Sequence, residues 1–305
     1  MGTITMILSA ASGALFGHTY KRKVRLGLDT SACLVWFSFS GTVLFLVAVM
    51  VVGAFPLSAG EGWIPVAYGA SAIVAMRAYY RFIETARLGI SWTVIQMSVV
   101  IPFISSLLIF RESIGLIGGF GVGCILAAIV VLGTQKRSDQ GDSEGGPAER
   151  TAARSSFRLL FIASFFTGVT STLIKAFSSI HTNPSAVPTF FLVASASMLF
   201  INVLAFLLLP ANSPPTKRRP QLFLVQTVGF GVYAGTTNTA AMVLLLLSAQ
   251  LLPGYFLFPV RNITNIIMVL GIATLVHGEK IQLREGIGVV IAVVGIGVLS
   301  LAMRG

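Results

Sequence analysis

Arg261 has the most unusual position of any charged residue in this sequence. It lies inside the motif RNITN, near the middle of a long apolar segment, and it shares one helical face with Asn265. An ionisable side chain at membrane depth is costly and usually faces a transport pathway. We therefore interpret Arg261, Asn262 and Asn265 as a polar constellation that binds a substrate. The alternative is a structural arginine that bonds to carbonyls of a helix broken at Pro253 and Pro259.

A second group of charges lies in the segment AMRAYYRFIETARLG. Arg77, Arg81 and Glu84 recur at positions i, i+4 and i+7, on one stripe of a helix. Glu84 is placed to pair with Arg81, which leaves Arg77 without a local acid and free to face a cavity. The alternative is a helix that ends near Tyr80, with its charges at the membrane interface. Tyr80 then fits either an aromatic belt or the wall of a binding site.

Two further places carry polar chemistry within apolar segments. Lys175 ends an apolar stretch of about sixteen residues, where it can snorkel to the interface or meet the anionic part of a substrate. The segment from 220 to 260 contains uncharged polar residues that suit either substrate binding or contacts between helices. These residues are Tyr233, Thr236, Thr237, Asn238 and Thr239.

Two glutamates sit where a helix meets a turn. Glu112 and Glu279 each precede a glycine-rich apolar segment, and a carboxylate there can accept hydrogen bonds from the N–H groups of a helix N-terminus. We expect both to be structural caps.

The sign of the intramembrane charge indicates the class of ligand. Arg77, Arg81, Lys175 and Arg261 stand against Glu84 alone. Arginine forks suit carboxylate or phosphate, so we expect a substrate with an anionic group.

No motif indicates catalysis, a metal or a cofactor. The sequence has no GxxxxGK[ST] phosphate-binding loop and no cluster of histidine, aspartate and serine in either half, so we expect a protein that is not an enzyme. If transport is coupled to protons, Glu84 is the candidate acid and His18 is a second candidate.

The composition places these residues in a membrane. Charged residues make up 10% of the 305 residues, against roughly 25% in an average soluble protein. Hydrophobic residues make up 55%, and the mean hydropathy is +0.89. The net charge of +11 does not indicate a nucleic-acid partner, because most basic residues lie in short clusters between apolar runs.

Apolar segments long enough to cross a bilayer recur along the chain. We count ten, in two groups of five separated by a polar linker, which gives an all-α membrane protein with halves at 1–134 and 158–305 and the linker at 135–157. The predicted spans lie at about 3–20, over most of 30–60, from about 63 through Glu84, and at 90–110, 114–133, 157–180, 186–209, in two segments within 220–279, and at 286–303.

The two halves resemble each other at their ends. FRESIGLIGGFGVGCILAAIVVLG in the first half aligns with HGEKIQLREGIGVVIAVVGIGVLS in the second, with Glu112 on Glu279 and Gly121 on Gly288. A repeat of five helices is odd in number, so the second copy must be inverted relative to the first. This arrangement is typical of secondary transporters, which bind substrate near the midplane between the repeats.

These motifs resemble the drug/metabolite transporter superfamily, and more narrowly its EamA-type members. The segment LLPGYFLFPVRNITNIIMVLGIATLVHGEK resembles the ninth helix of that group, with Phe258 and Pro259 well ahead of Glu279. In the first half Pro102 lies much closer to Glu112, so the two copies differ in where the helix bends. The resemblance implies a ten-helix secondary transporter, but it specifies the substrate poorly.

Together these observations predict a multi-pass protein of the cell membrane, plasma or inner, that moves a small polar metabolite by alternating access. The expected partners are a small-molecule substrate and the lipid bilayer, with coupling to a proton or ion gradient and a homodimer both left open. The alternatives are a flippase for lipid-linked substrates, a proton-coupled exporter of amphiphilic drugs or cations, and a structural or receptor protein that transports nothing.

The orientation of the termini is in conflict. The odd-numbered loops carry nearly all the lysine and arginine, which by the positive-inside rule places both termini outside the cell. The family resemblance implies cytoplasmic termini.

Overall fold

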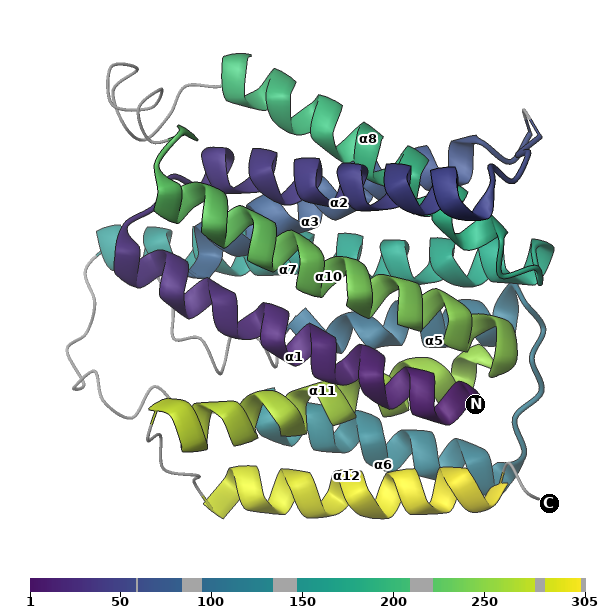
Figure 1. The fold of residues 1–305 in the computed structure, drawn as a ribbon. Helices are drawn as coiled ribbons and strands as arrows, with labels where there is room; N and C mark the ends of the chain where they lie inside the picture. The colour runs from purple at the N-terminus through teal and green to yellow at the C-terminus, as the bar shows by residue number, and fades with distance from the viewer. Residues whose placement is uncertain (59, 84–94, 134–146, 209–221, 278–282, 303–305) are drawn as a thin grey trace.

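The structure, a computed structural model, is a bundle of helices that run roughly antiparallel to one another (Figure 1). It describes the chain except residues 59, 84–94, 134–146, 209–221, 278–282 and 303–305. The described part holds ten α-helices and one short 3-10 helix, and it contains no strand. The prediction of an all-α fold is therefore confirmed.

The helices follow the apolar segments of the sequence. Their bounds are α1 (Gly2–Leu26), α2 (Thr30–Val52), α3 (Trp63–Ile83), η1 (Met97–Val99), α5 (Val100–Leu108), α6 (Leu116–Gly133), α7 (Pro147–Ile180), α8 (Ala186–Leu208), α10 (Val225–Leu251), α11 (Gly254–His277) and α12 (Leu283–Ala302).

Local chemistry explains several helix ends. Asp29 caps α2, because its carboxylate accepts a hydrogen bond of 2.8 Å from the backbone N–H of Ala32. Pro253 separates α10 from α11, and Pro259 lies inside α11, two residues before Arg261. Because proline has no backbone N–H, it leaves a carbonyl of the preceding turn without its helical hydrogen bond, close to Arg261.

Several boundaries differ from those predicted. Helix α1 runs to Leu26, past the predicted end near residue 20, and α2 ends at Val52. The described part of the third helix runs to Ile83, three residues past Tyr80, with Arg81 exposed in its last turn. Helix α7 begins at Pro147, so residues 147–157 of the predicted linker are helical. The sequence PAERTAARSS explains this, because proline suits the first helical position and alanine, glutamate and arginine favour helix.

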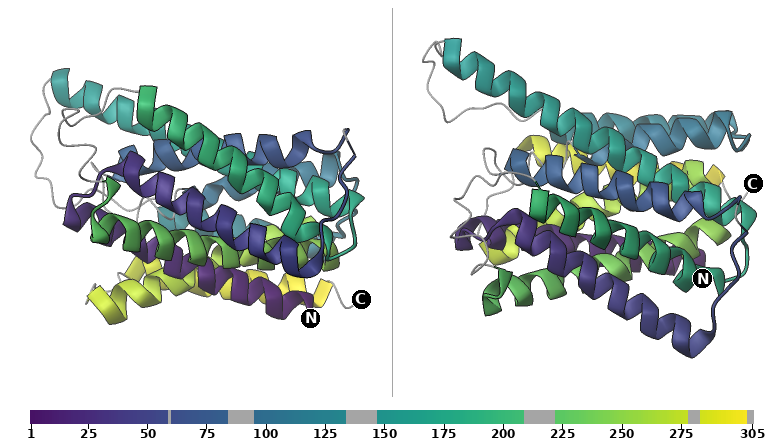
Figure 2. Two further views of the ribbon diagram at one scale, coloured as in Figure 1. Left: turned by 45° about the horizontal axis from the view of Figure 1, so that its top comes forward. Right: turned by 90° about the horizontal axis from the view of Figure 1, so that it is seen from above.

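Neighbouring helices pack in a defined order. α1 contacts α10 and α11, α2 contacts α8 and α10, α3 contacts α7 and α8, and α5 contacts α7 and α11. α6 packs along α12 at one side of the bundle, as the lower part of Figure 1 shows. The further views in Figure 2 show the same lengthwise packing, with the longest helix, α7, projecting beyond its neighbours at one end.

Glycines permit the closest of these contacts. A side chain on Gly235 of α10 would collide with Ser40 and with the backbone of Phe37 in α2. Gly121 of α6 and Gly295 of α12 face each other in the same way. Small residues of this kind let membrane helices approach closely.

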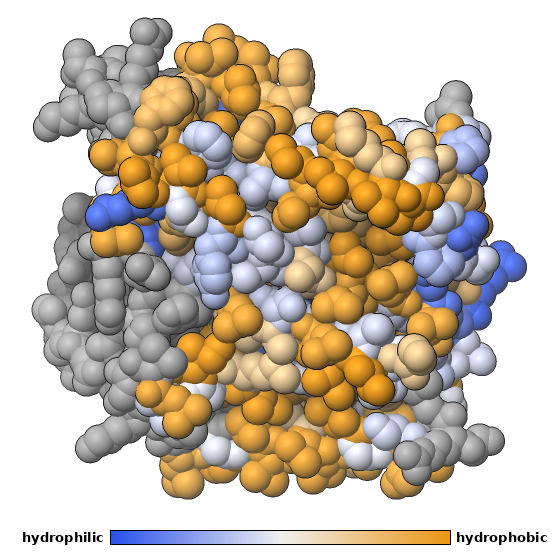
Figure 3. Space-filling view, in the orientation of Figure 1, coloured by the Kyte–Doolittle hydropathy of each residue, from blue (hydrophilic) through white to orange (hydrophobic). Residues whose placement is uncertain are grey.

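The outer surface is that of a helical membrane protein. Five helices of the described chain are long and apolar enough to cross a membrane, and three shorter apolar helices accompany them. Figure 3 shows hydrophobic residues over much of one face, with a paler, more polar patch left of its centre, while the most hydrophilic residues lie at its left and right edges, where the helices end.

Candidate functional site

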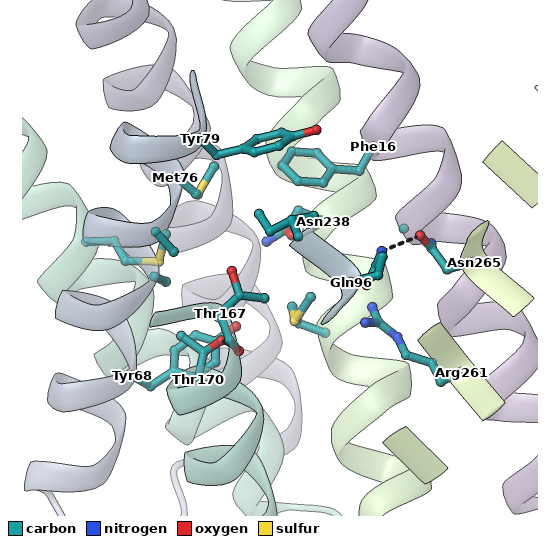
Figure 4. A pocket seen from close by; sticks show the side chains of 16 residues that line it. Phe16, Tyr68, Met76, Tyr79, Gln96, Thr167, Thr170, Asn238, Arg261 and Asn265 are labelled. Carbon is teal, nitrogen blue, oxygen red and sulfur yellow. Dashed lines mark hydrogen bonds between the residues drawn. The ribbon is translucent and has the colours of Figure 1, made fainter. Parts of the chain in front are cut away.

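A cavity of about 800 Å³, counting the space through which it opens, lies among the helices. Its lining comes from six helices, α1, α3, α7, α8, α10 and α11, together with the segment just before η1 (Figure 4). The lining residues are Gly13, Phe16, Tyr68, Ala72, Ala75, Met76, Tyr79, Ile95, Gln96, Thr167, Thr170, Met198, Asn238, Met242, Arg261 and Asn265.

Arg261 provides the charge of this cavity. The residue is 9% exposed and lies about 10 Å along α11 from the start of the helix. Its Nε donates to the Ser9 hydroxyl over 3.3 Å, and its Nη1 donates to the Asn262 side-chain oxygen over 3.4 Å. Within the described chain no carboxylate forms an ion pair with it. The guanidinium is held by neutral groups, so its charge is left for a ligand.

Amide side chains hold the wall beside Arg261 in place. Gln96 donates to the Asn265 side-chain oxygen over 2.8 Å, and the Asn265 amide donates to the Ala10 carbonyl over 2.8 Å. The Asn262 amide in turn donates to the Gln96 carbonyl over 3.4 Å. This network links α1, α11 and the segment before η1, and it fixes the polar wall of the cavity (Figure 4).

Hydroxyl groups lie across the cavity from Arg261. Figure 4 shows Thr167, Thr170 and Tyr68 on the side opposite the guanidinium. Thr167 and Thr170 donate their own hydroxyl protons to backbone carbonyls of α7, each over 2.7 Å. Their oxygens therefore face a ligand chiefly as hydrogen-bond acceptors.

The remaining walls are apolar and adaptable. Phe16 and Tyr79 lie at one end of the view in Figure 4, and Met76, Met198 and Met242 contribute thioethers. Methionine fills irregular spaces and makes favourable contacts with aromatic rings. The cavity thus has one polar, positively charged wall and a larger apolar remainder.

A smaller cavity of about 340 Å³ adjoins the first. The two share Tyr68, Met198, Asn238 and Met242, and the smaller one reaches Thr239 in the direction of α2. Asn238 thus lies where the two spaces meet.

Three of the predicted site residues line the main cavity: Arg261, Asn265 and Asn238. Asn262 lies behind Arg261 as its hydrogen-bond acceptor and is 7% exposed. The structure therefore brings the RNITN residues and the polar patch of α10 together.

Arg77 and Lys175 lie outside the cavity lining. Arg77 donates to the Asn202 side-chain oxygen over 3.0 Å and reaches the Ser31 hydroxyl at 3.5 Å. Lys175 forms an ion pair with Glu112, with 2.8 Å between the ammonium and carboxylate atoms. Of the two cations that were expected to meet substrate, Lys175 is thus paired with an acid of the protein and Arg77 is hydrogen-bonded to neutral side chains.

Glu112 caps a helix, as expected, but the helix belongs to the other half of the chain. Its carboxylate accepts a hydrogen bond of 3.1 Å from the backbone N–H of Tyr255, in the first turn of α11. Glu279, its partner in the repeat, lies outside the described residues.

Three other predicted residues lie away from the cavity. Tyr80 is buried, and the Lys23 ammonium stands over its ring, 5.3 Å from the centroid. Tyr233 is 48% exposed. Thr237 bonds to carbonyls of its own helix, at Tyr233 and Ala234.

The two candidates for proton coupling cannot be placed. Glu84 lies outside the described residues, and His18 belongs to α1 but its side chain is outside the described part.

Among the residues that the structure does describe, no group of three or more histidine, cysteine, aspartate or glutamate side chains could hold a metal ion.

The sequence interpretation missed Gln96, Tyr68, Thr167 and Thr170. Gln96 had a signal, because it is the one amide in the apolar run VIQMSVVIPF. The two threonines had none, because threonines recur throughout α7 and most of them bond to their own helix.

Comparison with known proteins finds the same fold among solved structures. No family model matches the chain, and no curated protein matches it. Among 28 matching chains of solved structures, a crystal structure of a protein superposes with a TM-score of 0.68 at 15% identity, over 99% of this chain and 96% of the other. At this identity the similarity establishes a shared fold along the whole chain.

Proposed function

We propose that the chain is a secondary active transporter that moves a small metabolite with an anionic group across the cell membrane by alternating access. The observation that supports this most strongly is the buried guanidinium of Arg261 on the wall of a cavity, with no described carboxylate to neutralise it. A buried cation of this kind is costly unless a ligand pairs with it for part of the time.

We also propose ten membrane spans in two inverted repeats, and the packing order supports this. If α1, α2, α3, α5 and α6 are exchanged with α7, α8, α10, α11 and α12, the pair α1–α10 becomes α7–α3, and α1–α11 becomes α7–α5. Likewise α2–α10 becomes α8–α3, while α2–α8, α5–α11 and α6–α12 map onto themselves. Every one of these pairs is in contact.

The position of the cavity agrees with such a repeat. Its lining takes α1 and α3 from the first half and α7, α8, α10 and α11 from the second, so it lies between the halves. Transporters built from inverted repeats bind substrate at this interface. The drug/metabolite transporter superfamily remains our proposal for the family.

The energy source is proposed to be a gradient of the substrate or of a coupled ion. Glu84 and His18 remain the candidates if that ion is the proton.

The orientation of the termini is tested by a C-terminal reporter, with alkaline phosphatase active only outside the cytoplasm and a fluorescent protein active only inside it.

Counterflow in proteoliposomes tests the proposal. Vesicles are preloaded with an unlabelled probe, and uptake of the same labelled probe is followed for a carboxylate, a phosphate monoester, an amino acid and an amine of one skeleton. We expect saturable counterflow of at least one probe with an anionic group, and its loss in Arg261→Gln. Counterflow of the amine alone, or of no probe, would contradict the proposal.

A further inference from the structure

We propose that the cavity selects a monocarboxylate that has an apolar body and a neutral hydrogen-bond donor, such as a phenolic hydroxyl, at its far end. This inference rests on the proposed function and names the substrate class for the same site.

The charge of the lining points to one negative charge on the ligand. Arg261 is the one charged residue among those that line the cavity within the described chain. Lys175 is paired with Glu112, and Arg77 lies outside the lining, so neither supplies a second positive charge to the cavity. A monoanion neutralises the wall, whereas a phosphate dianion adds an unpaired negative charge and a zwitterion brings an ammonium for which the lining has no acid.

The geometry of Arg261 suits a carboxylate. A guanidinium has five N–H donors in a planar fork. Its Nε and one N–H of Nη1 bond to Ser9 and Asn262, and Nη2 has no partner among the described residues. Nη2 and the second N–H of Nη1 remain for a ligand, and paired guanidinium donors suit the two oxygens of a carboxylate. Gln96 beside it keeps a second amide N–H beyond the one that it donates to Asn265.

The opposite wall suits a hydrogen-bond donor on the ligand. The hydroxyls of Thr167 and Thr170 donate their hydrogen bonds to the backbone, so their oxygens can accept one from a ligand. In Figure 4 both lie across the cavity from Arg261, so the ligand's donor must stand at the end remote from its carboxylate. A hydroxyl satisfies them without bringing a second charge into a space that has no described acid.

The rest of the lining is mostly apolar and also holds the amide of Asn238. Met76, Met198, Met242 and the rings of Phe16 and Tyr79 contribute to it, and such walls hold an aromatic ring well. A planar ring between a carboxylate and a hydroxyl therefore fits the sequence of surfaces from Arg261 to Thr170.

Binding to the purified full-length protein in detergent, measured by calorimetry, tests this with probes of one skeleton. The first is 3-(4-hydroxyphenyl)propanoate, and the others are 3-phenylpropanoate without the hydroxyl, tyrosine with an added ammonium, tyramine without the carboxylate, and the phosphate monoester of 2-(4-hydroxyphenyl)ethanol. We expect the first probe to bind most tightly, with about 10-fold weaker binding when the hydroxyl is absent.

Variants connect this preference to the residues. Arg261→Gln should weaken binding of the first probe about 100-fold, and Arg261→Lys, which keeps the charge but loses the fork, should weaken it less. Thr170→Val should reduce the preference for the hydroxylated probe, because only Thr167 then remains as an acceptor, and leave 3-phenylpropanoate unaffected. Arg158→Gln, at an exposed position of α7, is the matched control and should bind like the wild type. Each variant is first compared with the wild type by its thermal unfolding midpoint, and Arg261→Lys keeps the test open if Arg261→Gln does not fold.

The outcomes separate this inference from the proposed function. Tighter binding of tyrosine or of the phosphate monoester, lost in Arg261→Gln, would overturn the monocarboxylate assignment and leave an anion transporter standing. Binding of none of the five probes would also overturn it. Binding of the first probe without counterflow in vesicles would uphold the site and refute transport.

Discussion

The Lys175 ammonium lies 2.8 Å from the Glu112 carboxylate, and this pair joins helix α7 to the turn between α5 and α6. Glu112 also accepts from the backbone N–H of Tyr255, and Lys175 donates to the Leu252 carbonyl over 3.4 Å. Three separate pieces of chain, namely α7, the α5–α6 turn and the junction of α10 with α11, therefore meet at two side chains that are 11% and 15% exposed. We interpret this pair as the principal polar link at its end of the bundle.

Removing the carboxylate should destabilise the protein. Glu112→Gln leaves Lys175 largely buried without its partner charge, and we expect a loss of about 3 kcal/mol in the free energy of unfolding. The measurement is the thermal unfolding midpoint in detergent, with Arg158→Gln as the control at an exposed charge of α7. A double variant with Lys175→Met should lose less than Glu112→Gln alone, and an equal or larger loss would contradict the interpretation.

Asn202 should be required for the contact among α2, α3 and α8. It is fully buried, accepts from Arg77 and donates to the Leu34 carbonyl and the Ser38 hydroxyl. Asn202→Leu leaves these groups without partners and should lower the stability by about 2 kcal/mol. Thr236→Val, which removes an exposed hydroxyl bonded to its own helix, should have little effect. A wild-type unfolding midpoint for Asn202→Leu would show that this network contributes nothing.

The close approach of α10 to α2 predicts a contrast between two glycines of one helix. Gly235→Ala places a methyl group 2.6 Å from the Phe37 carbonyl oxygen, so the helices must separate and the unfolding midpoint should fall by several degrees. A side chain at Gly229 meets nothing within 4 Å, and Gly229→Ala should be neutral or stabilising. Equal midpoints for the two variants would argue against the packing described.

Glu61 predicts a small dependence of stability on pH. Hydrogen bonds from the side chain and the backbone of Ser58 hold the pKa of this loop carboxylate below its ordinary value of 4.5, with His181 contributing less. Because the pKa is lowered in the folded state, the stabilisation is complete above the unfolded pKa and is lost as the pH falls through the folded one. The unfolding midpoint of the wild type should therefore fall more steeply below about pH 5 than that of Glu61→Gln. Parallel curves for the two proteins would refute the effect.

The sequence predicted the charge of the candidate site better than its shape. Arg261 and Asn265 stood out because polar side chains four residues apart in an apolar helix occupy one face, and the structure places both on the cavity. For Lys175, the sequence did not indicate that the side chain is paired with an acid and lies outside the cavity lining. Its partner Glu112 is 63 residues away in sequence, and their meeting depends on how α7 packs beside α5.

Local pattern explains both limits of α2, although only its start was predicted well. Asp29 caps the helix at Thr30, and Gly53 follows its end at Val52, whereas the predicted span lay over most of 30–60. The cavity could not be predicted in this way. Met76, Thr170 and Asn238 come from three different helices, and their convergence is a property of tertiary packing.

The most direct test of the central claim is counterflow of 3-(4-hydroxyphenyl)propanoate and of tyramine in proteoliposomes, compared between the wild type, Arg261→Gln and Arg158→Gln. The account predicts saturable counterflow of the carboxylate but not of the amine in the wild type and in Arg158→Gln, and loss of that counterflow in Arg261→Gln. Counterflow of the amine alone, or carboxylate counterflow that survives in Arg261→Gln, would contradict it.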